Sequence, residues 1–150
     1  GSADADIGAT SIGNAGGRVQ AGNDLKAFLS GVANNSGGLM VAGNGLTLNA
    51  ARILNRDTQS VHASQPLALQ GASVALAASH IDNTAGTIAA DGGIGIRGPD
   101  AAGQLDNTRG SISSGGSIDI AVSRVLNPLG TLIAGQLINV AADSLGGDGS

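Results

Sequence analysis

The chain has 150 residues, 41% of them hydrophobic and 1% aromatic, with 26 glycines and a formal net charge of −4 at pH 7. A chain of this length can bury one sizeable core, but the shortage of aromatic side chains predicts a thin core of alanine, valine, isoleucine and leucine. The acidic balance argues against a nucleic acid as partner, because phosphate binding needs a basic face. All eleven acidic residues are aspartate, which together with glycine favours turns over helices.

One pattern recurs six times along the chain. It consists of an apolar residue, any residue, alanine or serine, three further residues, an apolar residue, any residue, and a last apolar residue or alanine. Two short alternating segments in each copy predict two strands with one buried face, separated by a turn. The third copy is assigned to Val61, Ala63, Leu67 and Leu69. The six copies begin at Val19, Met40, Val61, Ile88, Ile112 and Leu132.

An asparagine precedes every copy, and in five of the six a glycine follows it three residues later. Stacked asparagines can hydrogen-bond to one another and to the turn backbone, as in other parallel stacked strands. The glycine is expected to supply the left-handed turn residue. Thr58 replaces it before the third copy, which predicts a distorted turn there. The predicted structural ladder consists of Asn14, Asn35, Asn55, Asn83, Asn107 and Asn127.

A third apolar segment, such as Ile53-Leu54, closes most copies. Three short strands in roughly 20–27 residues make one coil of a parallel β-helix. The sequence therefore predicts an all-β, right-handed parallel β-helix (β-solenoid) of about six coils. The expected boundaries are a tag or partial coil over 1–11, the repeats over 12–142 and a flexible tail over 143–150.

Two connections are longer than the rest in this assignment. The third copy is followed by extra residues around Gly71, Ala72 and Ser73, and the fourth by the turn-forming segment that includes Pro99 and Asp100. Insertions in solenoids map to surface protrusions, which often carry binding. These five residues are the candidate binding loops, and a tolerated insertion without a role is the alternative.

Catalytic and metal-binding patterns are not visible in the sequence. His62 is expected to point to solvent between Val61 and Ala63, and His80 precedes a turn, so neither has the setting of a catalytic triad. The chain has no cysteine, hence no disulfide or thiolate metal site, and no apolar run suits a membrane-spanning helix. No enzyme activity, catalytic residue, cofactor, metal or small-molecule substrate is therefore predicted.

Three segments carry a resemblance to a known family: IDNTAGTIAA at 81–90, LDNTRGSI at 105–112 and LNPLGTLIAG at 126–135. They resemble the haemagglutinin repeat of filamentous-haemagglutinin-like two-partner-secretion exoproteins, which include adhesins and contact-dependent growth-inhibition proteins. The resemblance covers about residues 12–142. It departs from the family's pattern in the third copy and in the two long connections.

The resemblance implies a large bacterial exoprotein that is exported through an outer-membrane two-partner-secretion transporter and displayed at the cell surface. It implies a β-helical shaft that holds a binding or toxic tip and supports cell adhesion, a virulence-related role. A second interpretation makes the segment itself a module that binds a host or bacterial cell-surface receptor or glycan through its long connections. A third, a carbohydrate-active β-helix enzyme, has the least support, because such clefts need clustered carboxylates and aromatic faces.

Overall fold

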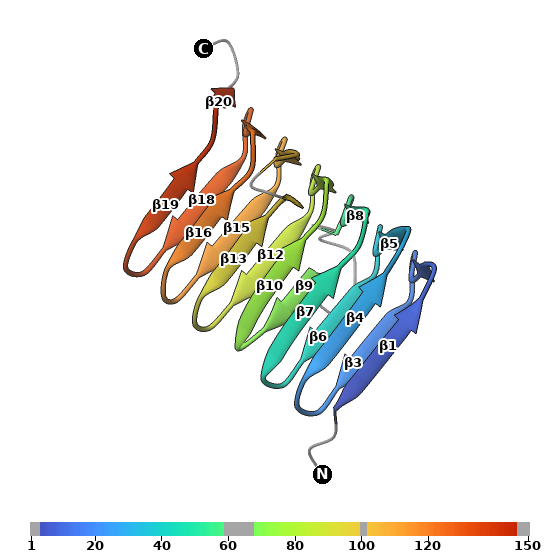
Figure 1. Ribbon diagram of the computed structural model, residues 1–150. Helices are drawn as coiled ribbons and strands as arrows, with labels where there is room; N and C mark the ends of the chain where they lie inside the picture. Colours follow the sequence, from blue (N-terminus) through green and yellow to red (C-terminus); the bar gives the residue numbers. More distant parts are fainter. Residues whose placement is uncertain (1–3, 59–67, 100–101, 147–150) are drawn as a thin grey trace.

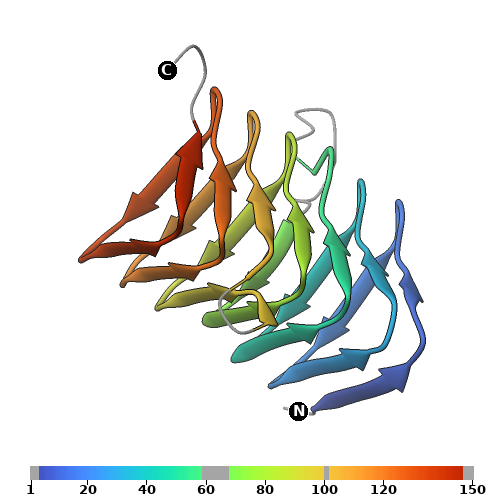
Figure 2. The ribbon, with the colours of Figure 1, turned by 45° about the horizontal axis from the view of Figure 1, so that its top comes forward.

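The structure, a computed structural model, describes residues 4–58, 68–99 and 102–146. These residues form twenty short strands in three parallel sheets, which stack coil upon coil into a β-solenoid (Figure 1). The predicted fold class is confirmed, including its right-handed winding, the hand that parallel crossovers favour. Successive coils lie about 4.8 Å apart, and the chain passes through all three sides of each coil before it rises to the next (Figure 2).

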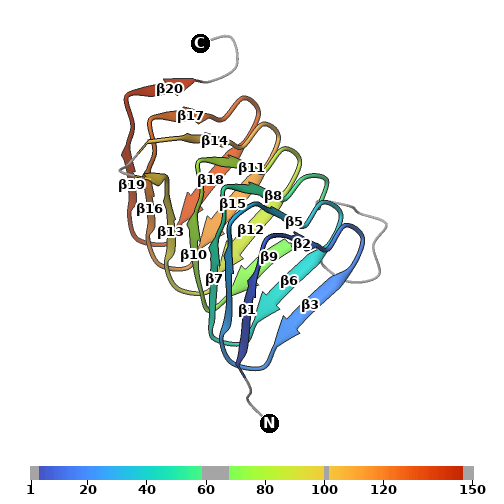
Figure 3. The same ribbon diagram turned by 45° about the vertical axis from the view of Figure 1, so that its right-hand side comes forward.

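Each sheet collects one strand from every coil, so strands that are neighbours in space are three apart in the chain (Figure 3). Sheet A contains β1 (Ala5–Ala9), β4 (Leu25–Leu29), β7 (Gly45–Asn49), β10 (Ser73–Ala77), β13 (Ile94–Arg97), β16 (Ile118–Ala121) and β19 (Ile138–Ala141). Sheet B contains β2 (Ile12–Gly13), β5 (Val32–Asn34), β8 (Arg52–Leu54), β11 (His80–Asp82), β14 (Gln104–Asp106), β17 (Arg124–Leu126) and β20 (Ser144–Gly146). Sheet C contains β3 (Arg18–Ala21), β6 (Leu39–Ala42), β9 (Ala68–Gly71), β12 (Thr87–Ala90), β15 (Ser111–Ser114) and β18 (Thr131–Ala134).

The core is a set of apolar columns in which a residue stacks on its counterpart one coil away. In sheet A, Leu46 pairs with Val74, which pairs with Ile94 and then Ile118, and each is at most 2% exposed. Alternation places the next residue of each strand outside. Phe28, the one phenylalanine, lies outside on sheet A beside Gly8 and is 54% exposed. The core is thus free of aromatic rings, as the composition predicts.

The solenoid extends beyond both boundaries expected from the repeats. β1 pairs with β4 over Ala5 to Ala9, so part of the segment 1–11 is a regular sheet A strand. β20 pairs with β17, so Ser144 to Gly146 belong to sheet B rather than to a flexible tail. Each of these segments supplies less than a full copy of the pattern, and the first was expected to be a tag or a partial coil.

The third copy was assigned to the wrong residues. Leu69 pairs with Met40 and Ile88, so it is the first position of the copy and not the last. The extra residues therefore precede Ala68, and Val61, Ala63 and Leu67 lie outside the described residues. Ser73 to Ala77 form the regular sheet A strand β10.

The described residues contain no helix that is long and apolar enough to cross a membrane.

Candidate functional site

The six predicted asparagines form a continuous ladder at the corner where sheet B passes into sheet C, here called the B–C corner. Each side-chain amide donates from Nδ2 to Oδ1 of the asparagine in the next coil. The distances from Asn14 through Asn35, Asn55, Asn83 and Asn107 to Asn127 are 2.6, 2.9, 2.7, 2.7 and 2.7 Å. All five bonds run in the same direction along the solenoid.

The ladder is bonded to the backbone as well as to itself. The Nδ2 of Asn107 also reaches the carbonyl of Thr131 in the next coil at 3.2 Å and that of Gly110 in its own turn at 3.4 Å. The backbone N–H of Asn107 donates to the carbonyl of Leu126 at 2.7 Å. Asn83 and Asn107 are 0% exposed. A buried amide needs such partners, and Asn107 thereby ties together its own turn and two segments of the next coil.

The glycines of the repeat have a different role from the one expected. The left-handed residue is the second after each asparagine, with φ of 52° at Ala85 and Arg109 and 58° at Leu129. A positive φ at that position is typical of a type II turn. The glycine at the third position is required for space. A Cβ on Gly110 would lie 2.3 Å from Oδ1 of Asn107 and from the carbonyl oxygen of Asn83.

Thr58 explains how one turn does without that glycine. In neighbouring coils, the N–H of the first sheet C residue bonds a glycine carbonyl, as Ser111 bonds Gly86 at 2.8 Å. At the exception, the N–H of Thr87 donates instead to Oγ1 of Thr58, at 2.7 Å. Thr58 is 3% exposed. Its hydroxyl therefore replaces a backbone acceptor where the chain departs into the segment 59–67.

A second, shorter ladder lies at the corner where sheet C passes into sheet A, here called the C–A corner. Oδ1 of Asp4 accepts from Nδ2 of Asn23 at 2.7 Å and from the N–H of Asp24 at 3.1 Å. One coil later, Oδ1 of Asp24 accepts from Nδ2 of Asn44 at 2.9 Å and from the N–H of Gly45 at 3.0 Å. Sequence reasoning missed this ladder, although the pairs Gly22-Asn23 before β4 and Gly43-Asn44 before β7 are a visible signal.

The hydrogen bonds at the C–A corner also change the acidity of its first carboxylate. The backbone N–H of Asp24, and next the amide of Asn23, hold the pKa of Asp4 below its ordinary value. Hydrogen bonds to the ionised form have this effect. The corner is exposed, in contrast to the buried B–C corner.

Other aspartates cap turns. The carboxylate of Asp82 accepts from the N–H and hydroxyl of Thr84, and that of Asp106 accepts in the same way from Thr108. Asp82 also pairs with Arg56 at 3.4 Å. These carboxylates stabilise turns, the role that their shared coil position suggests.

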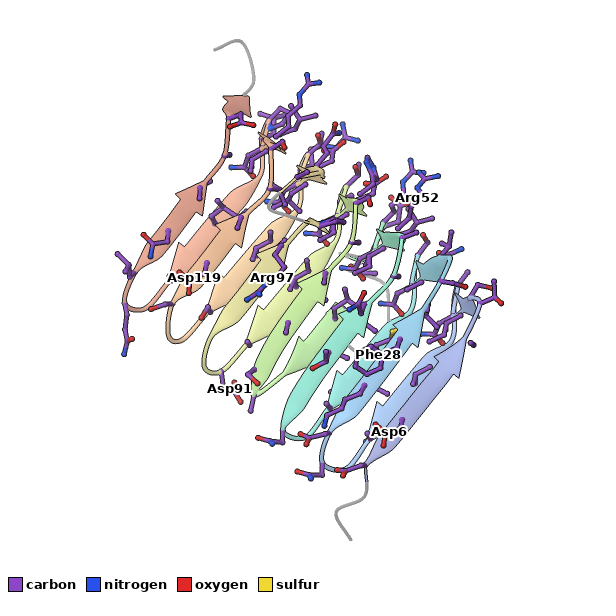
Figure 4. All side chains as sticks on the ribbon, viewed as in Figure 1. Asp6, Phe28, Arg52, Asp91, Arg97 and Asp119 are labelled. Atoms are coloured by element: carbon purple, nitrogen blue, oxygen red, sulfur yellow. The ribbon has the colours of Figure 1, made fainter. Side chains whose placement is uncertain are left out.

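The outer face of sheet A is hollowed next to the connection that follows β13. The hollow encloses about 550 Å³ above Gly95 and Ala121, and Arg97 and Asp119 border it. Figure 4 labels these two charged side chains on β13 and β16. Nδ2 of Asn139 donates to Oδ1 of Asp119 at 3.1 Å. Arg97 and Asp119 are both exposed. The surface thus carries one cationic and one anionic group over a floor of small residues.

The candidate binding residues fall in two places. Gly71 ends β9, Ala72 is a single bend residue and Ser73 begins β10, so the expected long loop at this position is wrong. A Cβ on Gly71 would lie 2.6 Å from the carbonyl of Ser73, which shows how tight the bend is. Pro99 borders a second hollow on the other side of Arg97, and Asp100 lies outside the described residues.

Metal-ligating side chains do not gather among the described residues. No cluster of three or more histidine, cysteine, aspartate or glutamate side chains occurs there. His80 lies on β11 between Arg52 and Gln104 of the neighbouring strands, and His62 is outside the described part. Comparisons with family models, curated proteins and solved structures found no match for this chain.

Proposed function

We propose that this chain is a shaft segment of a large secreted bacterial surface protein, of the adhesin or growth-inhibition kind, that holds a binding or toxic tip away from the cell. The observation that carries the proposal is the continuity of the asparagine ladder and of the apolar columns through the coils. A spacer needs length and stiffness. Each coil adds about 4.8 Å of length, and the ladder and the apolar columns make the stack stiff.

The resemblance of segments 81–90, 105–112 and 126–135 to the haemagglutinin repeat supports the same proposal. It implies export through an outer-membrane two-partner-secretion transporter and display at the cell surface. The invariant parts of these segments are the ones that build the B–C corner: the asparagine and the glycine three residues later. The resemblance therefore concerns residues with a demonstrable role in stacking coils, and a stacked rod is what a shaft requires.

A receptor- or glycan-binding module is the second candidate, favoured by the hollow on sheet A. Arg97 has five N–H donors suited to a carboxylate, and Asp119 can accept hydrogen bonds from the hydroxyl groups of a sugar. Pro99 stands beside this arginine, so the candidate keeps part of the predicted binding loop.

Binding of the purified chain to host and bacterial cells separates the two candidates. The chain would be compared with an Arg97→Ala variant and with a variant that lacks residues 99–102, each checked for β-rich circular dichroism. The shaft proposal expects no saturable binding by any of the three proteins. Saturable binding by the parent chain that both changes remove would contradict it and establish the hollow as a recognition site.

A further inference from the structure

Asn44 and Gly45 form the one Asn-Gly pair of the chain, and they lie at the exposed C–A corner, before β7. Asparagine is a chemically labile residue, and a following glycine leaves its side chain the least hindered. A Cβ on Gly45 would lie 3.3 Å from Oδ1 of Asp24 and 3.5 Å from Oγ of Ser73, so the Asp24 carboxylate would have to shift slightly to admit it. The glycine is therefore less tightly enclosed than Gly110, whose Cβ would meet backbone at 2.3 Å.

The reaction open to this pair is loss of the side-chain amide. The backbone nitrogen of Gly45 attacks Cγ of Asn44 and forms a new C–N bond. The Cγ–Nδ2 bond breaks, and ammonia leaves with the proton that Gly45 gives up. Water then opens the cyclic imide to aspartate or to isoaspartate, so the net change is one water consumed and one ammonia released.

Both nitrogens of this reaction donate a hydrogen bond to the same carboxylate oxygen. Oδ1 of Asp24 accepts from the N–H of Gly45 at 3.0 Å and from Nδ2 of Asn44 at 2.9 Å. The attacking nitrogen must lose its proton, and a negative charge beside it disfavours that loss, as like charges do for any acid. The two bonds also hold the groups in a fixed geometry.

We propose that Asn44-Gly45 is a latent site of spontaneous deamidation, which the carboxylate of Asp24 restrains in the folded chain. The modified residue places a second carboxylate directly against Asp24. In the unmodified chain, the amide of Asn44 donates a hydrogen bond to Asp24 at this position. The C–A corner loses the hydrogen bond from Nδ2 of Asn44 to Asp24, and the B–C corner is unaffected.

The preceding coil provides a matched control. Nδ2 of Asn23 and the N–H of Asp24 donate to Oδ1 of Asp4 in the same arrangement, at 2.7 and 3.1 Å. The residue after Asn23 is an aspartate and not a glycine, so its side chain hinders the attack. The identity of the following residue is the main chemical difference between the two steps of this ladder.

The test is incubation of the parent chain and its variants at mildly alkaline pH, followed by peptide mapping with mass spectrometry. Asp24→Asn keeps an acceptor oxygen but removes the charge, and we expect Asn44 to convert severalfold faster in it, because the attacking nitrogen then loses its proton more readily. Asp24→Asn combined with Gly45→Ala should return the rate to that of the parent. Asp4→Asn should leave Asn23 intact.

The parent chain supplies a second measurement that does not depend on a variant that folds. Its Asn44 should convert more slowly in native buffer than in urea, where Asp24 no longer restrains it. Equal rates in the two solvents, or an Asp24→Asn chain that converts no faster than the parent, would overturn the restraint. Earlier conversion of another asparagine in the folded Asp24→Asn chain would overturn the choice of site. None of these results bears on the shaft proposal.

Discussion

The asparagine ladders at two corners of the solenoid both bond each coil to the next, but they differ in burial, composition and continuity. At the B–C corner the ladder is buried, built from one residue type and continuous from Asn14 to Asn127. At the C–A corner the ladder is exposed, mixes aspartate with asparagine and is described over the first coils only, from Asp4 to Asn44. A coil needs its register fixed at one corner, and the other corners are then free to vary.

The variation at the C–A corner shows this freedom. The passage from β9 to β10 has Ala72 alone between the strands, whereas Gly43 and Asn44 separate β6 from β7. Both arrangements keep the apolar columns in line, since Leu46 still pairs with Val74. At the B–C corner, every described asparagine keeps the same two-residue interval to the left-handed position. Five predictions, from the largest effect to the smallest, test or sharpen this contrast.

The first prediction concerns the columns on which both corners depend. Ile118→Asp should abolish cooperative folding, because Ile118 is 0% exposed and a charge buried without a partner costs more than the stability of a typical domain. Leu46→Asp should do the same. Asp119→Ala, on the outward side of the same strand, should change the unfolding free energy by less than about 0.5 kcal/mol. A soluble Ile118→Asp protein with a sharp urea transition would contradict the inward assignment.

The second prediction concerns the space at the B–C corner. Gly110→Ala should destabilise the chain by about 2 kcal/mol or more, because the added methyl group meets Asn107 and the backbone of Asn83. Gly95→Ala is the control, since a Cβ there has no neighbour within 4 Å. Equal urea midpoints for the two variants would show that the turn can relax around the methyl group.

The third prediction compares the ladders directly. Asn107→Ala removes bonds to Asn83, Asn127 and the backbone, and should cost about 1–3 kcal/mol of unfolding free energy. Asn44→Ala at the exposed corner should cost less than about 0.5 kcal/mol. Equal losses in thermal or urea unfolding would remove the contrast between the corners.

The fourth prediction uses the left-handed turn residue. Leu129→Gly should stabilise the chain by about 0.5 kcal/mol, because Leu129 has a φ of 58° and an L side chain is strained there. Little packing is lost, since Leu129 is 71% exposed. A lower melting temperature for this variant would show that the leucine side chain makes a contact whose stabilisation outweighs the backbone strain.

The fifth and smallest effect is pH dependence at the C–A corner. The N–H of Asp24 and the amide of Asn23 hold the pKa of Asp4 below its ordinary value of 3.8. The contribution of Asp4 is therefore complete above that value and is lost as the pH falls through the lowered pKa. Asp4→Asn should make the urea midpoint less sensitive to acid than it is in the parent. An unchanged acid dependence would show that Asp4 contributes nothing measurable.

Much of this architecture follows from the sequence, because the signals of the B–C corner are local. A buried asparagine at a fixed phase, with glycine three residues later, marks every turn but the one that contains Thr58. The third copy could not be placed correctly, because Val61 to Leu69 reproduce the spacing of the pattern by chance. The true copy beginning at Leu69 breaks that spacing at Ala72, and short alternating segments do not encode register by themselves.

The role of the turn glycine could not be predicted from the sequence either. Both a left-handed φ and a close approach favour glycine, and only the backbone shows that Gly110 serves the second purpose while Arg109 adopts the left-handed conformation. The C–A ladder was missed because its acceptors are aspartates in some coils and absent from the pattern in others. Proximity of Arg97 and Asp119 follows from the pairing of β13 with β16, which no single segment reveals.

The most direct test of the central claim is hydrogen exchange of the side-chain amides, measured by nuclear magnetic resonance. If the B–C ladder is buried and continuous, the amide protons of Asn35, Asn55, Asn83 and Asn107 exchange far more slowly than those of Asn44 and Asn139. The same rate for both groups would contradict the ladder and leave the apolar columns and the backbone hydrogen bonds of the three sheets to hold the coils in register.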